Sequence, residues 1–390
     1  MISALTEPVR RDFGLNDTQV GILTTAFTLL YAVIGVPLGR LADRGSRKKL
    51  LAGGVSVWSL LTATSAIASG YGLLLFSRLG VAVGEAVCAP AATSWLGDLF
   101  PAEKRSRALA IFMLGVPIGG GLSFLLGGPL AQAFGWRTAM ALAAAPALLL
   151  VPALLSLDEP VRGATPSRQT IRDIIRIPTL WWIIASGAIL NFVAYAFAVF
   201  LSSFLIRVHG FSLGATGIAA GLLYGLGGIL GGVIAGRVGD WVIHKRKDGR
   251  MLAAALAALI SAPLGYLAIV QTSAVIAIPL LGLTYCFLTM YYGLVYSSIH
   301  DIIPPSMRGA AMGFYFMMMY LCGASFGPVI TGNLSDRMAR RAAAAAGSTE
   351  VTEVFKAVGL QQAMLIIPTL AIALSMVLYA GSRTMEKDMR

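Results

Sequence analysis

The stretch GRLADRGSRKK at residues 39–49 lies between two long apolar stretches, and a similar phrase, GRVGDWVIHKR, recurs at residues 236–246. At an offset of 197 residues, Gly39, Arg40, Asp43, Lys48 and Lys49 correspond to Gly236, Arg237, Asp240, Lys245 and Arg246. At an offset of 203 a second loop repeats, and Asp98, Pro101 and Arg105 correspond to Asp301, Pro304 and Arg308. Two separate loops that repeat at nearly the same spacing predict a chain of two related halves.

The segments around these loops are long and apolar. Hydrophobic residues make up 57% of the 390 residues and charged residues only 12%, whereas soluble domains carry roughly 25% charge. A helix needs about 20 apolar residues to cross a bilayer. Eleven complete spans are predicted, at 19–40, 50–69, 72–98, 106–133, 137–156, 179–206, 213–238, 251–270, 274–300, 308–335 and 358–381. Continuous apolar runs without alternation at period two favour helices, so the predicted fold is an all-α membrane protein with two pseudo-symmetric helical bundles.

Two polar stretches interrupt this pattern. Residues 157–178 carry seven charged side chains and three prolines. We therefore expect an N-terminal bundle at 1–156, a polar linker at 157–178 and a C-terminal bundle at 179–390. Residues 336–357 include an alanine run and are expected to form a helical or flexible loop outside the membrane.

Basic residues set the expected orientation. Of the 30 Lys and Arg residues, 21 lie after Ala380 or in loops that the predicted spans place on the same side of the membrane. These loops are 40–49, 99–107, 157–178, 237–250 and 300–308. Eight lie on the opposite side, and Arg78 lies within a span. Because basic loops stay in the cytoplasm, we expect a cytoplasmic linker and C-terminus, with residues 1–18 on the outer side.

Composition and motifs exclude several function classes. The net charge of +12 invites a nucleic-acid-binding interpretation, but the basic residues sit in loops where membrane topology requires them. Cys88, Cys286 and Cys322 lie in apolar stretches and are expected to be free. The sequence contains no CxxC, HExxH, P-loop or GxGxxG motif, so no metal, cofactor, ATP hydrolysis or enzymatic activity is expected. The glycine-rich stretch 225–232 is expected to pack closely against another helix.

Residues 39–49 also match the pattern G-x-x-x-D-R-x-x-R-K, with Gly39, Asp43, Arg44, Arg47 and Lys48 in register. On this pattern the chain resembles the major facilitator superfamily, whose best-known loop motif it is. Arg78 and Gly84 resemble the next motif of that family, on its fourth helix. The branch most resembled is the Spinster-like one, on the stretches EPVRRDFGLNDTQVGILTTAF, RLGVAVGEAVCAPAATSWLGDLFPAEKRSRALAIF and FGWRTAM.

The resemblance implies a transporter of lipid-type cargo in a bacterial inner membrane, coupled to protons, with twelve spans and both chain ends in the cytoplasm. The implied coupling residues are an Asp-Arg pair on the first helix and the glutamate of the GEA motif, which is Glu85 here. The Asp-Arg pair is absent from the sequence. Because MISALTEPVRRDFGLND at residues 1–17 resembles the outer end of the first helix and its periplasmic loop, we expect most of that helix to be missing. A gene product that begins about 20–40 residues earlier would supply it.

Glu85 is the acidic residue nearest the middle of a predicted span. An ionisable group there is costly and points to function, in this case a group that takes up and releases a proton. Arg78 lies seven residues earlier, about 10 Å away along the same helix face, too far for a direct ion pair. It suits a phosphate or carboxylate group of the cargo. The structural alternatives are a hydrogen bond from Glu85 to a neighbouring helix and an Arg78 that braces helices through backbone carbonyls.

The second half offers aromatic and amide side chains at helical spacing. Asn191 and Tyr195 share one helix face, and Tyr285, Tyr292 and Tyr296 share another. Tyrosine combines an apolar ring with a polar tip, so these residues are candidates to line an amphipathic cavity. Helix packing or an interfacial aromatic belt is the structural alternative for each. His300 lies near the cytoplasmic end, where an interfacial role is favoured.

Charged residues at the cytoplasmic helix ends are candidates for a gate. Paired charges that close one face break at high cost, which suits a two-state switch. Topology alone explains basic residues at these positions but not an aspartate. The gate candidates are Gly39, Asp43, Arg44, Arg47, Asp98, Arg105 and Asp240.

Together these features predict a monomeric, proton-coupled secondary transporter that moves an amphipathic or lipid-like anion by alternating access. A drug:proton antiporter or a small organic-anion carrier of the same fold is the nearest alternative. A membrane receptor or structural protein without transport is the alternative from another class. Transport assays across lysolipids, drugs and carboxylates would separate them.

Overall fold

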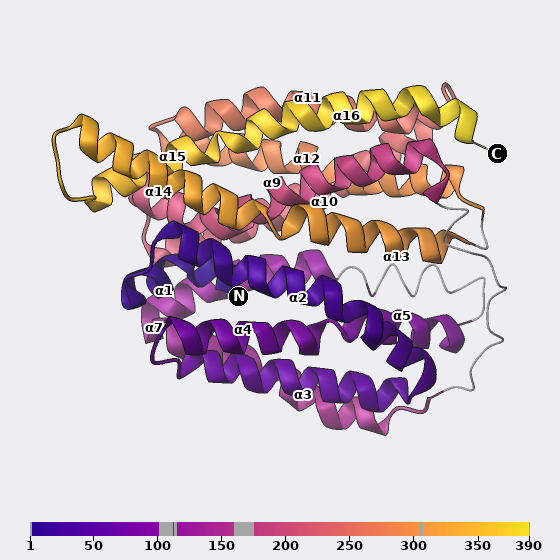
Figure 1. Ribbon diagram of the computed structural model, residues 1–390, viewed down its shortest axis with the longest axis horizontal. Coiled ribbons are helices and arrows are strands. Elements are labelled where there is room, and N and C mark those ends of the chain that lie inside the picture. Colours follow the sequence, from indigo (N-terminus) through magenta and orange to yellow (C-terminus); the bar gives the residue numbers. More distant parts are fainter. Residues whose placement is uncertain (1, 101–111, 113–114, 160–174, 305–306, 390) are drawn as a thin grey trace.

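The computed structural model describes residues 2–100, 112, 115–159, 175–304 and 307–389, and every regular element in these ranges is a helix. The first group comprises η1 (Ile2–Leu5), α1 (Thr6–Phe13), α2 (Asp17–Arg44), α3 (Arg47–Ala66), α4 (Tyr71–Glu85), α5 (Cys88–Leu99) and α7 (Gly115–Ser156). The second comprises α9 (Pro178–His209), α10 (Leu213–Ile243), α11 (Gly249–Val270), α12 (Ala274–Ile302), α13 (Arg308–Met319), η3 (Tyr320–Ala324), α14 (Gly327–Ala345), α15 (Glu353–Met364) and α16 (Ile366–Asp388). Figure 1 shows the two groups side by side, with most long helices nearly parallel to one another.

The molecule has two ends, which we name after residues. The Asp17 end is where α2 begins and α9 ends, on the left of Figure 1. The Arg47 end is where α3 begins and α5 ends, on the right. At the Asp17 end α14 and α15 extend past the other helices as a hairpin (Figure 1), so most of the polar stretch 336–357 is helical.

Nine helical segments in the described ranges are long and apolar enough to cross a membrane, so the predicted count of eleven is not confirmed. Two predicted spans, 106–133 and 137–156, largely fall in the single segment Ile118–Ser156. This segment changes direction at Gly135, whose φ of 81° is readily adopted only by a residue without a Cβ atom. Helix α3 has 20 residues but is not among the nine, because serine, threonine and glycine dilute its apolar side chains. The internal symmetry of the two halves stays a prediction.

The stretch 39–49 forms a tight turn between two helices. Helix α2 ends at Arg44 and α3 begins at Arg47, with the side chain of Ser46 accepting a hydrogen bond from the amide of Lys49. Helix α2 begins with a capping box, in which the side chain of Asn16 accepts from the amide of Gln19 and the Gln19 side chain accepts in return. Such caps satisfy the free amides of a helix start and fix where each helix begins.

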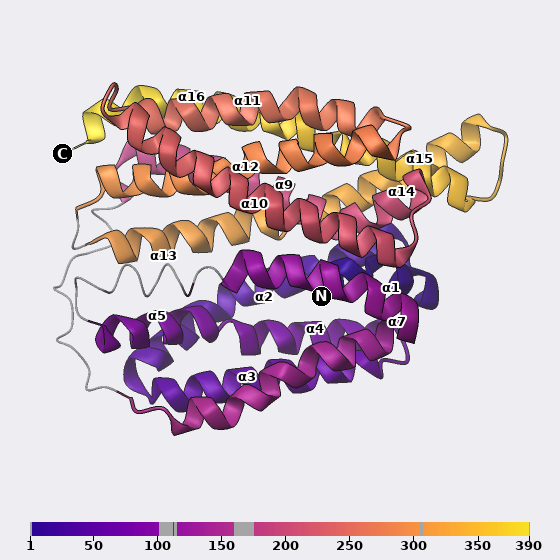
Figure 2. The same cartoon turned by 180° about the vertical axis from the view of Figure 1, so that it is seen from behind.

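Small residues bring the two groups together near the Asp17 end. Gly21 of α2 packs against the backbone of Pro328 in α14, and Gly128 of α7 packs against Gly217 of α10. Figure 1 shows the α2–α14 contact on one side of the molecule and Figure 2 the α7–α10 contact on the other. Backbones can approach so closely only where no Cβ intervenes. The glycine-rich stretch 225–232 packs in the same way, since a Cβ atom at Gly231 would clash with the backbone of Cys286 in α12, which confirms that prediction.

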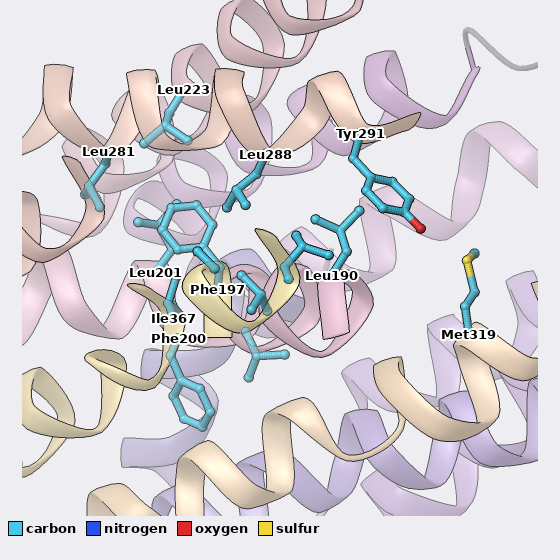
Figure 3. Packing of buried hydrophobic residues seen from close by; sticks show 14 of the residues in the cluster. Leu190, Phe197, Phe200, Leu201, Leu223, Leu281, Leu288, Tyr291, Met319 and Ile367 are labelled. Carbon is cyan, nitrogen blue, oxygen red and sulfur yellow. The ribbon is translucent and has the colours of Figure 1, made fainter. Parts of the chain in front are cut away.

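The core of the second group forms around α9. Figure 3 shows Leu190, Phe197, Phe200 and Leu201 of this helix surrounded by apolar side chains from neighbouring helices. Large apolar side chains that are exposed in the chain alone, such as Leu149 and Val275, are those that a bilayer would cover. The three cysteines are free, as predicted.

Candidate functional site

Glu85 is the last residue of α4, and the helix is interrupted there before α5 begins at Cys88. The predicted span at 72–98 agrees with one membrane-length segment, Tyr71–Leu96. Ala86 and Val87 between the two helices keep right-handed helical backbone angles, and the amide of Ala86 still donates to the carbonyl of Ala82, so the interruption is a local distortion of one membrane helix beside Glu85. Glu85 itself is half-buried, and within the described ranges its carboxyl group makes no side-chain hydrogen bond or ion pair.

Arg78 lies on the same helix and interacts electrostatically with Glu85 without forming an ion pair. Its guanidinium lies 5.1 Å from the ring centre of Phe27 on α2. The Nε atom of Arg78 is buried and has no hydrogen-bond partner among the described residues. A buried N–H without a partner is costly, so this guanidinium has a donor available for an anionic ligand.

Aromatic side chains from both groups meet beside these charges. The ring of Tyr31 on α2 lies 5.5 Å from that of Tyr320 in η3, and Tyr195 on α9 lies 6.0 Å from Tyr320. The ring of Tyr31 also stacks on that of Phe27 at 6.1 Å, the ring over which the Arg78 guanidinium lies. The candidate site therefore combines Arg78, Glu85, Phe27 and Tyr31 of the first group with Tyr195 and Tyr320 of the second.

Three of these residues, Phe27, Tyr31 and Tyr320, were not predicted from the sequence. Phe27 and Tyr31 have the same i, i+4 spacing as Asn191 and Tyr195, and this spacing was the signal that could have identified them. Tyr320 opens a π-helical turn, Tyr320–Ala324. Such turns are rare and occur often at functional sites, but no pattern in the sequence predicts this one.

The remaining second-group candidates lie in the packed interior. The amide of Asn191 donates to the carbonyl of Gly187 and to the sulfur of Met319. Tyr285 packs against the rings of Tyr224 and Phe197. Tyr292 and Tyr296 contact each other at 5.6 Å, and Tyr296 also contacts Tyr315 and Phe316. His300 is exposed near the end of α12. Within the described residues no cluster of three or more metal-ligating side chains occurs.

At the Arg47 end, two gate candidates meet. The buried guanidinium of Arg47 forms a 2.6 Å ion pair with Asp98 and a 3.3 Å pair with Glu159. Burial alone would raise the pKa of Glu159, but hydrogen bonds from Ser46 and Arg47 lower it to about 2. All these residues belong to the first group or to the segment that follows it, so the cluster braces one half and does not join the two.

The second group contains a corresponding pair. Arg250 at the start of α11 forms two 2.7 Å hydrogen bonds to Asp301 at the end of α12. Arg250 lies 203 residues after Arg47, the offset that also relates Asp98 to Asp301. The gate candidate Asp240, which corresponds to Asp43 at the offset of 197, is exposed on α10.

The other gate candidates add little contact information. A Cβ atom added at Gly39 would meet Pro90 at ordinary van der Waals distance. The side chains of Asp43 and Arg44, and the whole of Arg105, lie outside the described part of the chain.

At the Asp17 end a buried charge cluster joins the two groups. Arg207 at the end of α9 pairs with Glu7 of α1 at 2.9 Å and with Asp17 of α2 at 2.8 Å. Arg10 pairs with Glu7 and with Glu353 of α15. We call these five residues the Arg207 network. Burial alone would raise the pKa of Glu7, but Arg10 and Arg207 lower it to about 2, so this carboxyl is charged at neutral pH.

Two neighbouring side chains of α14 reinforce the network. The hydroxyl of Ser335 donates to Asp17. The carboxylate of Asp336 accepts from the amides of Asp17 and Thr18 and from the Thr18 hydroxyl. The first turn of α2 is thus capped by a residue of the other group. In the sequence these charges resemble ordinary loop residues, because the contacts join positions 190 to 343 residues apart that no local pattern relates.

Comparison with known proteins gives a consistent family assignment. A family model described as Major Facilitator Superfamily matches residues 1–328. An "MFS-type efflux pump" of Mycolicibacterium smegmatis is 32% identical, over 86% of this chain and 80% of that protein. Human "Protein spinster homolog 1" is 29% identical, over 87% of this chain and 70% of that protein. The crystal structure of a bacterial homologue of the human lysosomal transporter Spinster, inward-facing and unoccupied, has a TM-score of 0.90 at 26% identity and covers 100% of this chain and 94% of that one.

Proposed function

The chain belongs to the Major Facilitator Superfamily and is a Spinster-like transporter, and from this premise we propose that it is proton-coupled and moves an amphipathic, lipid-like anion. The observation that carries the proposal is the site around Arg78 and Glu85. It holds one cation and one acid on a single membrane helix, beside aromatic rings from both halves.

Arg78 binds the anionic group of the cargo in this proposal. Its unpartnered Nε–H and planar guanidinium suit the two oxygens of a phosphate or carboxylate. The rings of Phe27, Tyr31, Tyr195 and Tyr320 offer apolar faces for an adjoining chain, while the tyrosine hydroxyls add hydrogen-bond partners.

Glu85 carries the proton. A carboxyl next to an arginine is charged when the arginine is otherwise unpaired and is more readily protonated when an anion occupies that arginine. Cargo binding and proton binding at Arg78 and Glu85 are then linked, because each changes the charge that the other residue sees. This linkage couples transport to a proton gradient without ATP.

Alternating access requires that one end open while the other is closed. We propose that the Asp17 end is periplasmic and the Arg47 end cytoplasmic, in a bacterial inner membrane, with the basic linker and C-terminus inside. In this proposal the Arg207 network and the glycine contacts between α2 and α14 hold the periplasmic side closed. The state resembles the inward-facing relative.

The gate candidates at the cytoplasmic end act in the opposite state. Gly39, Asp43, Arg44, Arg47, Asp98, Arg105 and Asp240, together with the Arg250–Asp301 pair, keep the cytoplasmic helix ends rigid so that they can meet when that side closes. The transporter works as a monomer, since both halves of the site come from one chain.

A second candidate function is favoured by one comparison. The relative that is 32% identical is described as an efflux pump, which fits a drug:proton antiporter of the same fold. Purified protein in liposomes with an imposed pH gradient separates the candidates when tested with a lysophospholipid, a cationic drug and a small carboxylate. Movement of the lysophospholipid alone supports the proposal, and movement of the drug alone replaces it with the antiporter.

A further inference from the structure

Among the described residues of the Asp17 end, three arginines on α14 have no carboxylate partner. Each of the other lysines and arginines at this end pairs with one. Of the eight Lys and Arg residues that the sequence places at the Asp17 end, the structure pairs five with carboxylates: Arg10, Arg11, Arg137, Arg207 and Lys356. The other three are Arg337, Arg340 and Arg341. Within the described residues they are exposed and make no ion pair, ring contact or side-chain hydrogen bond.

These three arginines share one helix face. At 100° per residue, positions 337, 340 and 341 fall within a single exposed sector of α14. The opposite sector is buried against the protein and carries Ser335, Ala339 and Ala343. The guanidinium groups therefore lie together on the outside of the α14–α15 hairpin, away from the Arg207 network.

The same face is apolar about two to three turns earlier. Phe326 and Ile330 lie in the same angular sector and are each 44% exposed. The exposed face of α14 changes from apolar to basic side chains near Gly332, which packs against Asp17, the first residue of α2. Phe326 and Ile330 face lipid chains if the helices span the membrane, and a rise of 1.5 Å per residue puts Arg337 about 7–8 Å beyond Gly332. That height is the headgroup layer above the hydrocarbon.

We propose that this arginine face, Arg337, Arg340 and Arg341, binds the anionic headgroups of phospholipids in the outer leaflet. Guanidinium groups bind phosphate oxygens in pairs, and three within two helical turns attract anionic lipid electrostatically. Membrane topology gives no reason for them, because basic residues on the outer side oppose the positive-inside rule. The choice of leaflet rests on the orientation in the proposed function; the binding itself does not.

The experiment measures phospholipid retention by native mass spectrometry of the purified full chain, with phosphatidylglycerol and phosphatidylcholine in competition. The test variant is R337Q/R340Q/R341Q. The control variant R11Q/R137Q/K356Q removes the same charge from the same end but takes residues that already have carboxylate partners. Wild-type protein should retain phosphatidylglycerol in preference to phosphatidylcholine. Each arginine removed in the test variant should lower this preference about fivefold. The control variant should keep it.

Equal retention by the test variant and wild-type protein would overturn the proposal, and so would an equal loss in the control. Displacement of the lipid by millimolar inorganic phosphate would show a site for free anions instead and would also overturn it. The charge-preserving variant R337K/R340K/R341K should retain more lipid than the glutamine variant, which excludes a folding defect as the cause. None of these measurements needs transport activity. Labelling of Ser348→Cys in cells by an impermeant thiol reagent tests the leaflet separately.

Discussion

Replacement of Arg207 tests whether the Arg207 network holds the periplasmic side closed. Arg207 donates to Glu7 at 2.9 Å and to both oxygens of Asp17 at 2.8 and 2.9 Å. The side chains of Arg207, Glu7 and Asp17 are 2%, 2% and 4% exposed. Arg207→Gln therefore leaves two carboxylates buried without their main cation, and loss of one partner of a buried ion pair costs about 3–5 kcal/mol.

The lower end of that range applies here. Glu7 keeps Arg10 and Arg11, and Asp17 keeps the hydroxyl of Ser335. The cost falls on the closed state, because water reaches these carboxylates once the halves separate. A cost of about 3 kcal/mol shifts the equilibrium toward the open state by a factor of about 100.

The assay is the reaction rate of a cysteine at Thr24 with an impermeant maleimide, in a chain whose three native cysteines are replaced. Thr24 lines a small cavity together with Val9 of α1 and Val199 of α9, so it is shielded while the halves are closed. Arg207→Gln should raise the labelling rate by up to about 100-fold, the factor that the ion-pair cost gives. Addition of Asp17→Asn should reverse part of the increase, since it removes one of the unpaired charges.

Arg137→Gln is the matched control. Its pair with Asp12 has a similar length of 2.6 Å, but the two side chains are 44% and 39% exposed and belong to one half. Such a pair contributes about 0–1 kcal/mol, so labelling should change little. Unchanged labelling in a folded Arg207→Gln protein, or an equal rise in Arg137→Gln, would refute the assignment of the network as the periplasmic gate.

Three further outcomes are expected. Glu85→Gln should abolish transport driven by a pH gradient while counterflow of labelled cargo without a gradient continues; a wild-type response to the gradient would remove Glu85 from the coupling role. Arg47→Gln leaves Asp98 and Glu159 without their shared cation and should destabilise the protein by about 3 kcal/mol, measured as a lower thermal midpoint, with Arg250→Gln giving a comparable loss. The folded-state pKa of Glu7, about 2, lies below its ordinary value of 4.5, so its stabilising contribution is complete above about pH 4.5 and is lost as the pH falls toward 2. Because only the thiolate reacts, the labelling rate at Thr24 is divided by that of a fully exposed cysteine at the same pH. This ratio should be constant from about pH 5 to pH 8 and rise only in stronger acid; a rise within that range would show that another group titrates.

The sequence predicted the parts of the site that a membrane makes conspicuous. Glu85 and Arg78 stand out because charge within a span is rare and costly, and the Arg47–Asp98 pair followed from charges at adjacent helix ends. The all-helical fold and the close packing of residues 225–232 were predicted for the same reason, since lipid restricts both backbone and side-chain choices.

Contacts between distant segments were not predicted. Glu7, Arg207 and Glu353 form one buried network, yet each resembles an ordinary loop charge in sequence, and only the approach of the two halves pairs them. Arg250 was missed because it lies beyond the phrase that repeats at an offset of 197 and corresponds to Arg47 only at the offset of 203. In the π-helical turn that Tyr320 opens, a Cβ atom at Gly323 would clash with the backbone of Ala188 on α9, and no local sequence pattern predicts that close approach.

The capping of α2 by Asp336 makes opening of the Asp17 end a hydration event. The amides of Asp17 and Thr18 and the Thr18 hydroxyl all donate to this one carboxylate of the opposite half. When the halves separate, these donors lose their acceptor together, and a helix start cannot leave them unsatisfied. Water has to enter the crevice as the helices part, so wetting and helix movement are a single step. The energy of opening then depends on water activity at that end of the molecule, and a high concentration of an excluded solute there favours the closed state without touching the protein.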